Sequence, residues 1–134
     1  MATALLSATH LVGFTLLMGS VSVSALRQIG AVLTERPASE CTVAADRAVL
    51  VGLSISVATG LLLFAARAPA AVVNGFFQLK MLLLVSAALF HVACFRRVPR
   101  RADPSRQIMR LNGVAGFALW AGVALAGCAY ILLE

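Results

Sequence analysis

The sequence predicts an all-α fold, a bundle of four transmembrane helices that run up-down-up-down. Of its 134 residues, 61% are hydrophobic and 12% are charged, whereas soluble domains have roughly 45–50% apolar and about 25% charged residues. Uncharged runs at 1–26, 48–66, 68–79 plus 81–95, and 111–133 form four apolar stretches. Each is close to the ~17–25 residues that a membrane-spanning helix needs, the third only if Lys80 is tolerated within it. We therefore expect one domain over residues 1–134, with helices at about 4–33, 44–66, 73–97 and 107–133.

The first predicted helix is rich in leucine and in small residues such as Gly13 and Gly19, which let neighbouring backbones approach closely in lipid. No Lys or Arg precedes this apolar run, and the run is longer than the core of a signal peptide, so we expect it to be kept as a span. His10 lies about two turns from its outer end. Arg27 lies near its inner end, where its side chain is expected to reach the lipid headgroups.

The second predicted helix follows a polar connection, and we expect Thr42 to cap its N-terminus and Asp46 to lie in its first turn. Small residues then recur every four positions, which predicts close packing against a neighbouring helix. They are Gly52, Ser56 and Gly60. The link to the third helix is short, so the second and third helices are expected to be antiparallel neighbours, with Asn74 capping the third.

The third predicted helix contains the only lysine of the chain, Lys80, and one of its two histidines, His91. A charge inside the hydrocarbon costs about 2.5–3.5 kcal/mol on insertion scales, so such a side chain faces other helices or reaches the headgroups. Two interpretations of Lys80 stay open. It either extends to the outer headgroups or serves as a fixed cation for an anionic group, such as a haem propionate or a substrate carboxylate.

The fourth predicted helix begins after a proline-containing connection, with Asp103 or Ser105 as its cap. It carries a second stripe of small residues, formed by Ala118, Gly122 and Ala126. Trp120 lies in the middle of this helix, away from the interfacial belt where tryptophan is enriched. We expect it to pack internally, or against a partner or a ligand.

The net charge of +6 follows the predicted loops. Nine of the ten arginines lie in or beside the first and third connections, and only Arg67 lies in the second. The positive-inside bias therefore places both basic connections in the cytoplasm and both termini on the outer, periplasmic face of a bacterial inner membrane. This explains the charge without a nucleic-acid partner. Four of these arginines are also candidates for binding anionic lipid headgroups, namely Arg96, Arg97, Arg100 and Arg101.

The three cysteines, Cys41, Cys94 and Cys128, show no CxxC spacing. We expect them to be free thiols, because a disulfide or metal framework would need paired cysteines in a suitable compartment.

Helical rise sorts the polar residues of the spans into two layers. His10 and Lys80 lie about six and seven residues from the outer ends of their helices, and Arg27, His91 and Asn112 lie about six residues from the inner ends. The two histidines are therefore about 18 Å apart along the membrane normal, so they cannot both ligate one haem iron. No Asp or Glu falls within the uncharged run of a predicted span, so we expect no carboxylate proton relay.

These residues allow several roles. His10 is either a core histidine hydrogen-bonded to a Ser or Thr, a single axial haem ligand with a Met or another subunit's group opposite, or another cofactor contact. His91 and Asn112 are expected to form an interhelical hydrogen bond, which would also serve to orient a ligand.

The segments HLVGFTLLMGSVSVSALRQIG, TGLLLF and FQLKMLLLV, with the following FRR, resemble a family of bacterial four-helix membrane proteins without an assigned activity. More distantly, the pattern is similar to that of the HemJ-type protoporphyrinogen oxidases and the CopD-type copper-resistance proteins. The first resemblance implies the four-helix fold. In the HemJ type, a first-helix His and a third-helix Lys are essential and haem b is bound, and the matching positions here are His10 and Lys80. His91 and Asn112 also have counterparts there. The resemblance implies a scaffold that holds a porphyrin or a quinone beside His10 and Lys80.

Three functional hypotheses follow. The first is a subunit that binds haem b or is otherwise redox-linked, with His10 on the iron, Lys80 on a propionate, and His91, Asn112 and Trp120 around the cofactor; quinone is the other candidate cofactor. If this chain is an enzyme, it is then an oxidoreductase acting on a porphyrin or a quinone. The second is a non-catalytic structural subunit of a larger membrane complex, and the third is CopD-like copper transport. In each case the partners are membrane lipids and either copies of this chain or other subunits.

Overall fold

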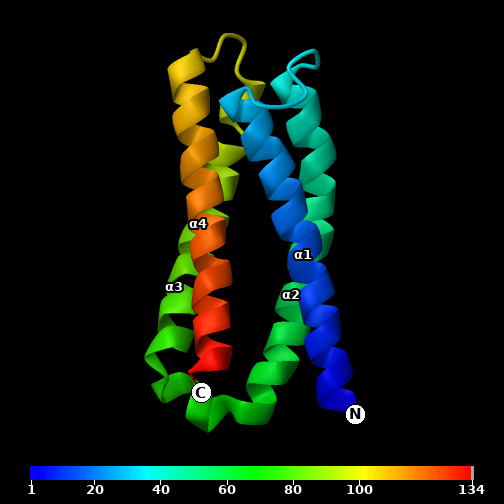
Figure 1. Ribbon diagram of the computed structural model, residues 1–134, viewed down its shortest axis with the longest axis vertical. Coiled ribbons are helices and arrows are strands. Elements are labelled where there is room, and N and C mark those ends of the chain that lie inside the picture. Colours follow the sequence, from blue (N-terminus) through cyan, green and yellow to red (C-terminus); the bar gives the residue numbers. More distant parts are fainter. Residues whose placement is uncertain (134) are drawn as a thin grey trace.

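The computed structural model describes residues 1–133 and confirms the four-helix fold (Figure 1). Within this range the chain forms four long helices and no strand: α1 (Ala2–Ile29), α2 (Ala38–Val73), α3 (Gly75–Phe90) and α4 (Arg106–Leu132). A π-helical turn, η1 (His91–Phe95), continues α3, and a short 3₁₀ turn, η2 (Val98–Arg100), follows it. The spans Ala2–Ile29, Ala38–Val73, Gly75–Arg100 and Arg106–Leu132 are long and apolar enough to cross a membrane.

α1 ends four residues earlier than predicted. Gly30 adopts a left-handed conformation with φ 89°, and its N–H and that of Ala31 both bond back to the Leu26 carbonyl, at 3.1 and 2.9 Å. Glycine adopts this conformation without steric cost, and it stops the helix while pairing one of its last carbonyls.

α2 begins earlier and ends later than predicted. It starts at Ala38, directly after Pro37, so the expected Thr42 cap was wrong; the Thr42 hydroxyl lies inside the helix and donates to the Ala38 carbonyl at 2.9 Å. The helix also continues beyond a kink at Arg67, where φ is −135° and ψ is 22°. Pro69, two residues later, has no N–H for the helical ladder, which accounts for a break here. The second connection is therefore helical almost to its end.

The predicted caps of α3 and of α4 are present. The Asn74 side chain accepts hydrogen bonds from the Phe76 and Phe77 N–H groups, at 2.9 and 3.2 Å. Ser105 caps α4 by accepting from the Ile108 N–H at 3.2 Å. These polar side chains pair N–H groups that the first turn of a helix leaves without partners.

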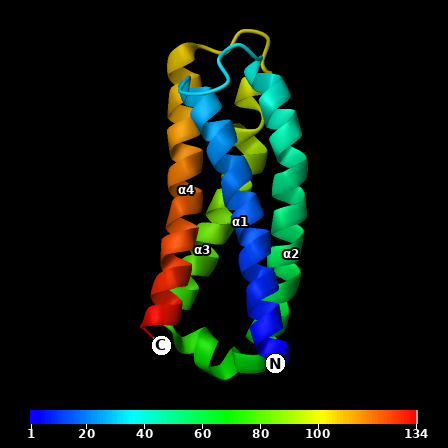
Figure 2. The same cartoon turned by 45° about the vertical axis from the view of Figure 1, so that its right-hand side comes forward.

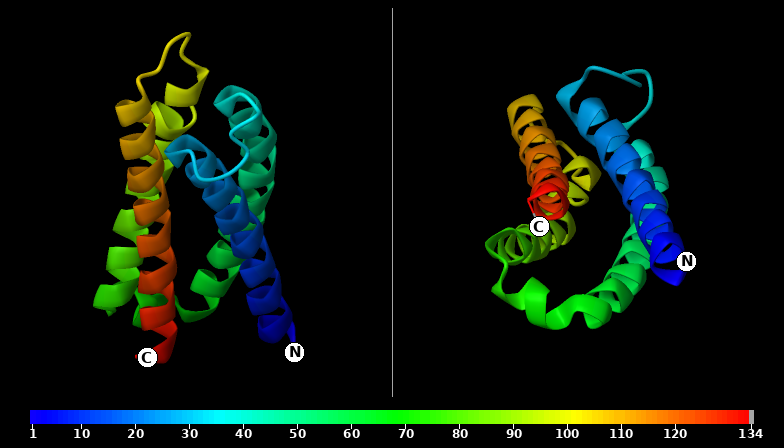
Figure 3. Two further views of the ribbon diagram at one scale, coloured as in Figure 1. Left: turned by 45° about the horizontal axis from the view of Figure 1, so that its top comes forward. Right: turned by 60° about the horizontal axis from the view of Figure 1, so that its bottom comes forward.

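The bundle is built from two helix pairs. α1 packs along α2, α3 packs along α4, and α4 also contacts α1, whereas α2 and α3 touch little. The two pairs lie close together at the end that carries the α1–α2 and α3–α4 connections, and they separate toward the end that carries both termini (Figures 1 and 3). Figure 2 shows the same separation from a second side. We call these the loop end and the terminal end.

Small residues produce the close contacts within this arrangement. A Cβ on Gly52 would lie 2.6 Å from the Gly13 carbonyl oxygen, so α1 and α2 meet almost backbone to backbone. The predicted stripe on α4 was wrong in part, because Ala118 is exposed. The buried face of α4 instead carries Gly113 and Gly116; Gly113 lies against α1, and Gly116 lies against the ring of Phe95.

Candidate functional site

The structure contains a cavity of about 260 Å³ between the two helix pairs. All four helices line it, mostly with aliphatic and aromatic side chains, and it is open on one side. Its polar contributors include His10 of α1, Ser56 of α2 and Lys80 of α3. The helices that line it belong to the two pairs, which separate toward the terminal end (Figure 3).

The His10 ring is positioned by a hydrogen bond with its neighbour Thr59. The His10 Nδ1 atom lies 3.1 Å from Thr59 Oγ1, and the threonine hydroxyl donates its proton to the Ile55 carbonyl at 2.6 Å. That hydroxyl has only one proton, so a ring proton on Nδ1 satisfies both groups. In this tautomer Nε2 keeps its lone pair.

The main chain fixes the position of this histidine as well. Ser56 donates to the His10 carbonyl at 3.4 Å, and Gly60 lies beside the ring, where a Cβ would be 3.2 Å from His10 Cε1. The predicted small stripe of α2 therefore both packs against α1 and makes room for the imidazole.

Lys80 reaches the same cavity from α3. Its aliphatic part passes α4 at Gly127, where a Cβ would lie 3.4 Å from Lys80 Cε. The depth argument from the sequence thus placed His10 and Lys80 together correctly, and both side chains line one apolar cavity.

Aromatic side chains surround the cavity. Phe64 of α2 stacks on Phe77 of α3 with 5.4 Å between ring centroids, and Tyr130 of α4 tilts against Phe77 at 5.7 Å. Trp120 is buried and lines the cavity, as expected for internal packing, and its ring meets that of His91 edge-on at 6.3 Å. Trp120 therefore contacts both the cavity and the polar residues nearer the loop end.

The predicted hydrogen bond between His91 and Asn112 was wrong. Asn112 donates to the Gln28 side chain at 2.6 Å and to the Phe95 carbonyl at 3.2 Å, and Gln28 also donates to that carbonyl at 3.3 Å. The cause is local: the residue four positions after Phe95 is Pro99, which has no N–H to offer a helical carbonyl. The two side-chain amides replace the missing donor and join α1, η1 and α4.

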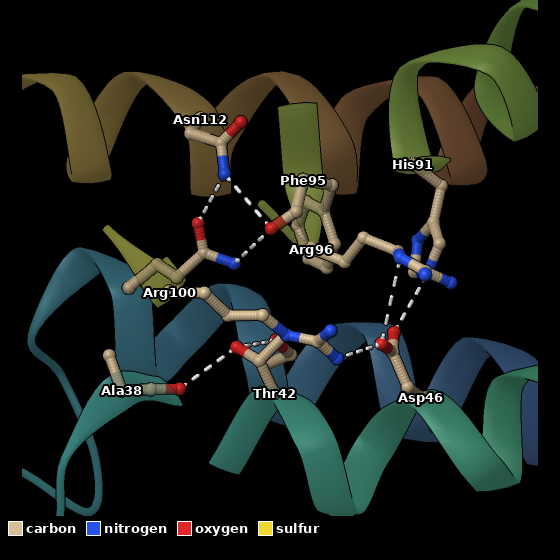
Figure 4. Close-up of polar contacts among 10 residues, drawn as sticks. Ala38, Thr42, Asp46, His91, Phe95, Arg96, Arg100 and Asn112 are labelled. Carbon is tan, nitrogen blue, oxygen red and sulfur yellow. Dashed lines mark hydrogen bonds and ion pairs between the residues drawn. The ribbon is translucent and has the colours of Figure 1, made fainter. Parts of the chain in front are cut away.

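His91 binds Asp46 instead. His91 Nε2 lies 3.2 Å from Asp46 Oδ1, Arg100 donates to Asp46 Oδ2 at 2.6 Å, and Arg96 Nε lies 4.0 Å from the same oxygen (Figure 4). Of the four arginines predicted to bind lipid headgroups, Arg96 and Arg100 thus face a carboxylate, and Arg97 and Arg101 are exposed.

Asp46 is the residue that the sequence reasoning missed. The expectation of no carboxylate within a span was wrong, because α2 starts at Ala38 and Asp46 therefore lies about two turns inside it, buried. The same rise arithmetic that placed His91 would have found it once the true start of α2 was known. Arg27, which was expected to reach the headgroups, donates to the Arg36 carbonyl at 2.9 and 2.6 Å.

Residues 1–132 match the model of a protein family described as a family of unknown function, DUF6644. This chain belongs to the DUF6644 family. No curated protein and no solved structure matches the chain.

The residues of this DUF6644 chain limit the metal chemistry that the cavity supports. Within residues 1–133, no group of three or more His, Cys, Asp or Glu side chains is arranged to hold a metal ion. The cavity contributes His10 and the thioether of Met81 as potential soft ligands. The three cysteines are free, as predicted, and none of them lines the cavity.

Proposed function

We propose that this DUF6644 protein is a redox-linked subunit of the bacterial inner membrane that binds its cofactor in the cavity between the helix pairs. The observation that carries the proposal is the His10 imidazole, held by Thr59 in a mostly apolar cavity that is also lined by the Lys80 side chain. Small-molecule sites combine an apolar lining with a few placed polar groups, and this cavity has that composition.

Haem b is the first candidate cofactor. An axial imidazole uses one ring nitrogen for iron and donates the other N–H to a neighbouring acceptor, and His10 already donates to Thr59 in this way. Lys80 supplies a cation for a propionate. Bound haem would supply one-electron chemistry, while Trp120 and the aromatic lining exclude water. The resemblance to HemJ-type oxidases, through His10 and Lys80, supports the same assignment.

Quinone is the second candidate, and the size of the cavity favours it. Pockets for drug-sized ligands occupy ~300–1,000 Å³, and this one is about 260 Å³. It holds only part of a group as large as a porphyrin, so the rest would extend through its open side. A quinone ring is smaller, and its oxygens suit an imidazole and an ammonium. Copper transport of the CopD type is less well supported, since His10 and Met81 are the soft ligands in the lining.

The same proposal includes orientation and partners. The basic loop end would face the cytoplasm and the terminal end the periplasm, by the positive-inside bias. The exposed Arg97 and Arg101 would contact anionic headgroups. The chain would act as a homo-oligomer or as a subunit of a larger membrane complex, exchanging electrons with a partner.

The test is an absorption spectrum of the detergent-purified chain, before and after addition of hemin. We expect a Soret band that His10→Ala abolishes and that His91→Gln, the matched change at the other histidine, preserves. A protein that stays colourless with hemin would reject haem. Quenching of Trp120 by a short-chain ubiquinone, weakened in His10→Ala, would then support the quinone assignment, and no quenching would reject the cavity as a cofactor site.

A further inference from the structure

A second group of ionisable residues lies outside the cavity, toward the loop end. His91 and Asp46 are deeply buried, with side chains 9% and 10% exposed, whereas the Arg96 and Arg100 side chains are 35% and 38% exposed. The cluster therefore has a buried core and an edge that reaches the surface. Its charged members come from α2 and from the segment after α3, and α4 contributes the neutral ring of Trp120.

One nitrogen of His91 has no partner. An ionised carboxylate only accepts hydrogen bonds, so Asp46 Oδ1 accepts the proton of His91 Nε2, and the neutral ring then has its lone pair on Nδ1. Nδ1 is buried and has no hydrogen-bond partner within residues 1–133. Buried polar atoms are nearly always paired, so an unpaired one calls for an explanation, and a catalytic or proton-binding role is among those known.

The contact with Asp46 favours a positive charge on the His91 ring. Protonation forms a second N–H bond on the ring and gives an imidazolium that still donates Nε2–H to Asp46 at 3.2 Å. The Phe95 ring stacks on the imidazole at 5.2 Å, and Trp120 meets it edge-on. Arg100 and Arg96 also face this carboxylate (Figure 4), so they reduce its attraction for a proton on His91, and negative charge arriving nearby would add to that attraction.

The cavity is the place where such charge would arrive. Trp120 lines the cavity and contacts His91, so only one side chain separates the two in this direction. We propose that His91 is a proton-binding site whose occupancy is linked through Trp120 to the charge held in the cavity. The link rests on the proposed function: an electron donated to the cofactor by a one-electron carrier of a partner subunit would be balanced by a proton that enters from the aqueous phase at the loop end and binds Nδ1.

The proton site is tested without any cofactor. Trp120 is the only tryptophan and His91 is one of only two histidines, so tryptophan fluorescence of the purified chain reports protonation of the adjacent ring. Because an imidazolium quenches indole, we expect fluorescence to fall as the pH is lowered from 8 to 5. His91→Gln should abolish this change, and His10→Gln, the matched control, should retain it. A change that persists in His91→Gln, or no change in the unsubstituted chain, would overturn the proposal.

A second measurement covers the case in which His91→Gln does not fold. NMR titration of the two imidazole rings in the unsubstituted chain, with His10 assigned from the His10→Gln spectrum, shows directly whether His91 binds a proton in this range. A His91 ring that stays in one state from pH 5 to pH 8 would contradict the assignment.

The link is tested on the chain loaded with hemin and reduced by dithionite in a redox titration. We expect the midpoint potential to fall as the pH rises, by up to 59 mV per pH unit for one proton per electron, and to become independent of pH in His91→Gln. A potential that is already independent of pH would overturn the link. A chain that binds no hemin would overturn both the haem proposal and this link, while the fluorescence titration would still decide the proton site.

Discussion

Asn112 of α4 and Gln28 of α1 form a 2.6 Å hydrogen bond in the buried part of the bundle, and both side chains also donate to the carbonyl of Phe95. This contact joins the two helix pairs at the loop end, where they are closest. It also satisfies a carbonyl that Pro99 leaves without a helical partner.

We therefore expect Asn112→Ala to destabilise the fold by about 1–2 kcal/mol, since interhelical hydrogen bonds in membranes contribute ~0.6–1.7 kcal/mol and the remaining polar groups lose a partner. A detergent titration that follows unfolding measures this change in stability. Ser86→Ala is the control, because that hydroxyl bonds only the Leu82 carbonyl of its own helix. Equal stability of the two variants would show that the amide contact contributes nothing.

Close contact between α1 and α2 gives a second prediction. A Cβ on Gly52 would lie 2.6 Å from the Gly13 oxygen and 2.8 Å from the Leu17 nitrogen, both backbone atoms. Gly52→Ala should therefore push the helices apart and cost about 1–3 kcal/mol. Gly19→Ala, on the same pair of helices, meets nothing within 4 Å and should be neutral or slightly stabilising. The same unfolding titration measures both variants. An equal loss of unfolding free energy in both would refute the packing argument.

The tautomer of His10 gives a third prediction. Thr59→Val removes the oxygen that accepts the Nδ1 proton, and loss of such a supporting contact typically weakens metal binding about 10–100-fold. We expect this decrease in hemin affinity, measured by Soret titration. Thr15→Val is the control, because Thr15 is exposed and bonds only the Leu11 carbonyl. Unchanged hemin affinity in Thr59→Val would mean that Thr59 does not prepare His10 for a ligand.

Asp46 provides a fourth prediction. Removing one partner of a buried ion pair costs about 3–5 kcal/mol, but Arg100 is more than a third exposed, so solvent reduces the loss. We expect Asp46→Asn to destabilise the chain by about 1–3 kcal/mol in the unfolding titration. Asp103→Asn, at an exposed position of the α3–α4 connection, should have no effect. Equal destabilisation of both variants would show that the loss of any carboxylate charge, and not of the contacts with His91 and Arg100, lowers the stability.

The part of the site that the sequence predicts is the part that depends on depth alone. Rise per residue is constant in a helix, so counting residues from the ends of the spans places His10 and Lys80 at one level, and the structure places both in one cavity. The fold class follows from apolar length for the same reason.

Contacts that depend on where a helix ends, and on how it is rotated about its own axis, could not be predicted by counting residues. His91 and Asn112 were expected at one level, but His91 lies beside Trp120, whereas Asn112 binds the Phe95 carbonyl. The partner of Asn112 is set by a proline four residues beyond Phe95. Asp46 was missed because α2 begins directly after Pro37, several residues before the uncharged run from which this helix was predicted. Composition also cannot predict that the helix pairs separate toward the terminal end, or that a cavity lies between them.

Lys80 gives the last prediction, and it separates a cofactor contact from a structural role. Lys80→Met keeps an unbranched chain beside Gly127 and removes the charge. If the ammonium pairs with a propionate, hemin affinity should fall about 10–100-fold, since hydrogen bonds to charged groups contribute ~1.5–3 kcal/mol. Haem dimethyl ester, which has no propionate charge, should bind the variant and the unsubstituted chain equally. Soret titrations of both ligands provide the comparison. An equal loss of affinity for both ligands would mean that Lys80 only shapes the cavity, and no loss for either would remove Lys80 from the site.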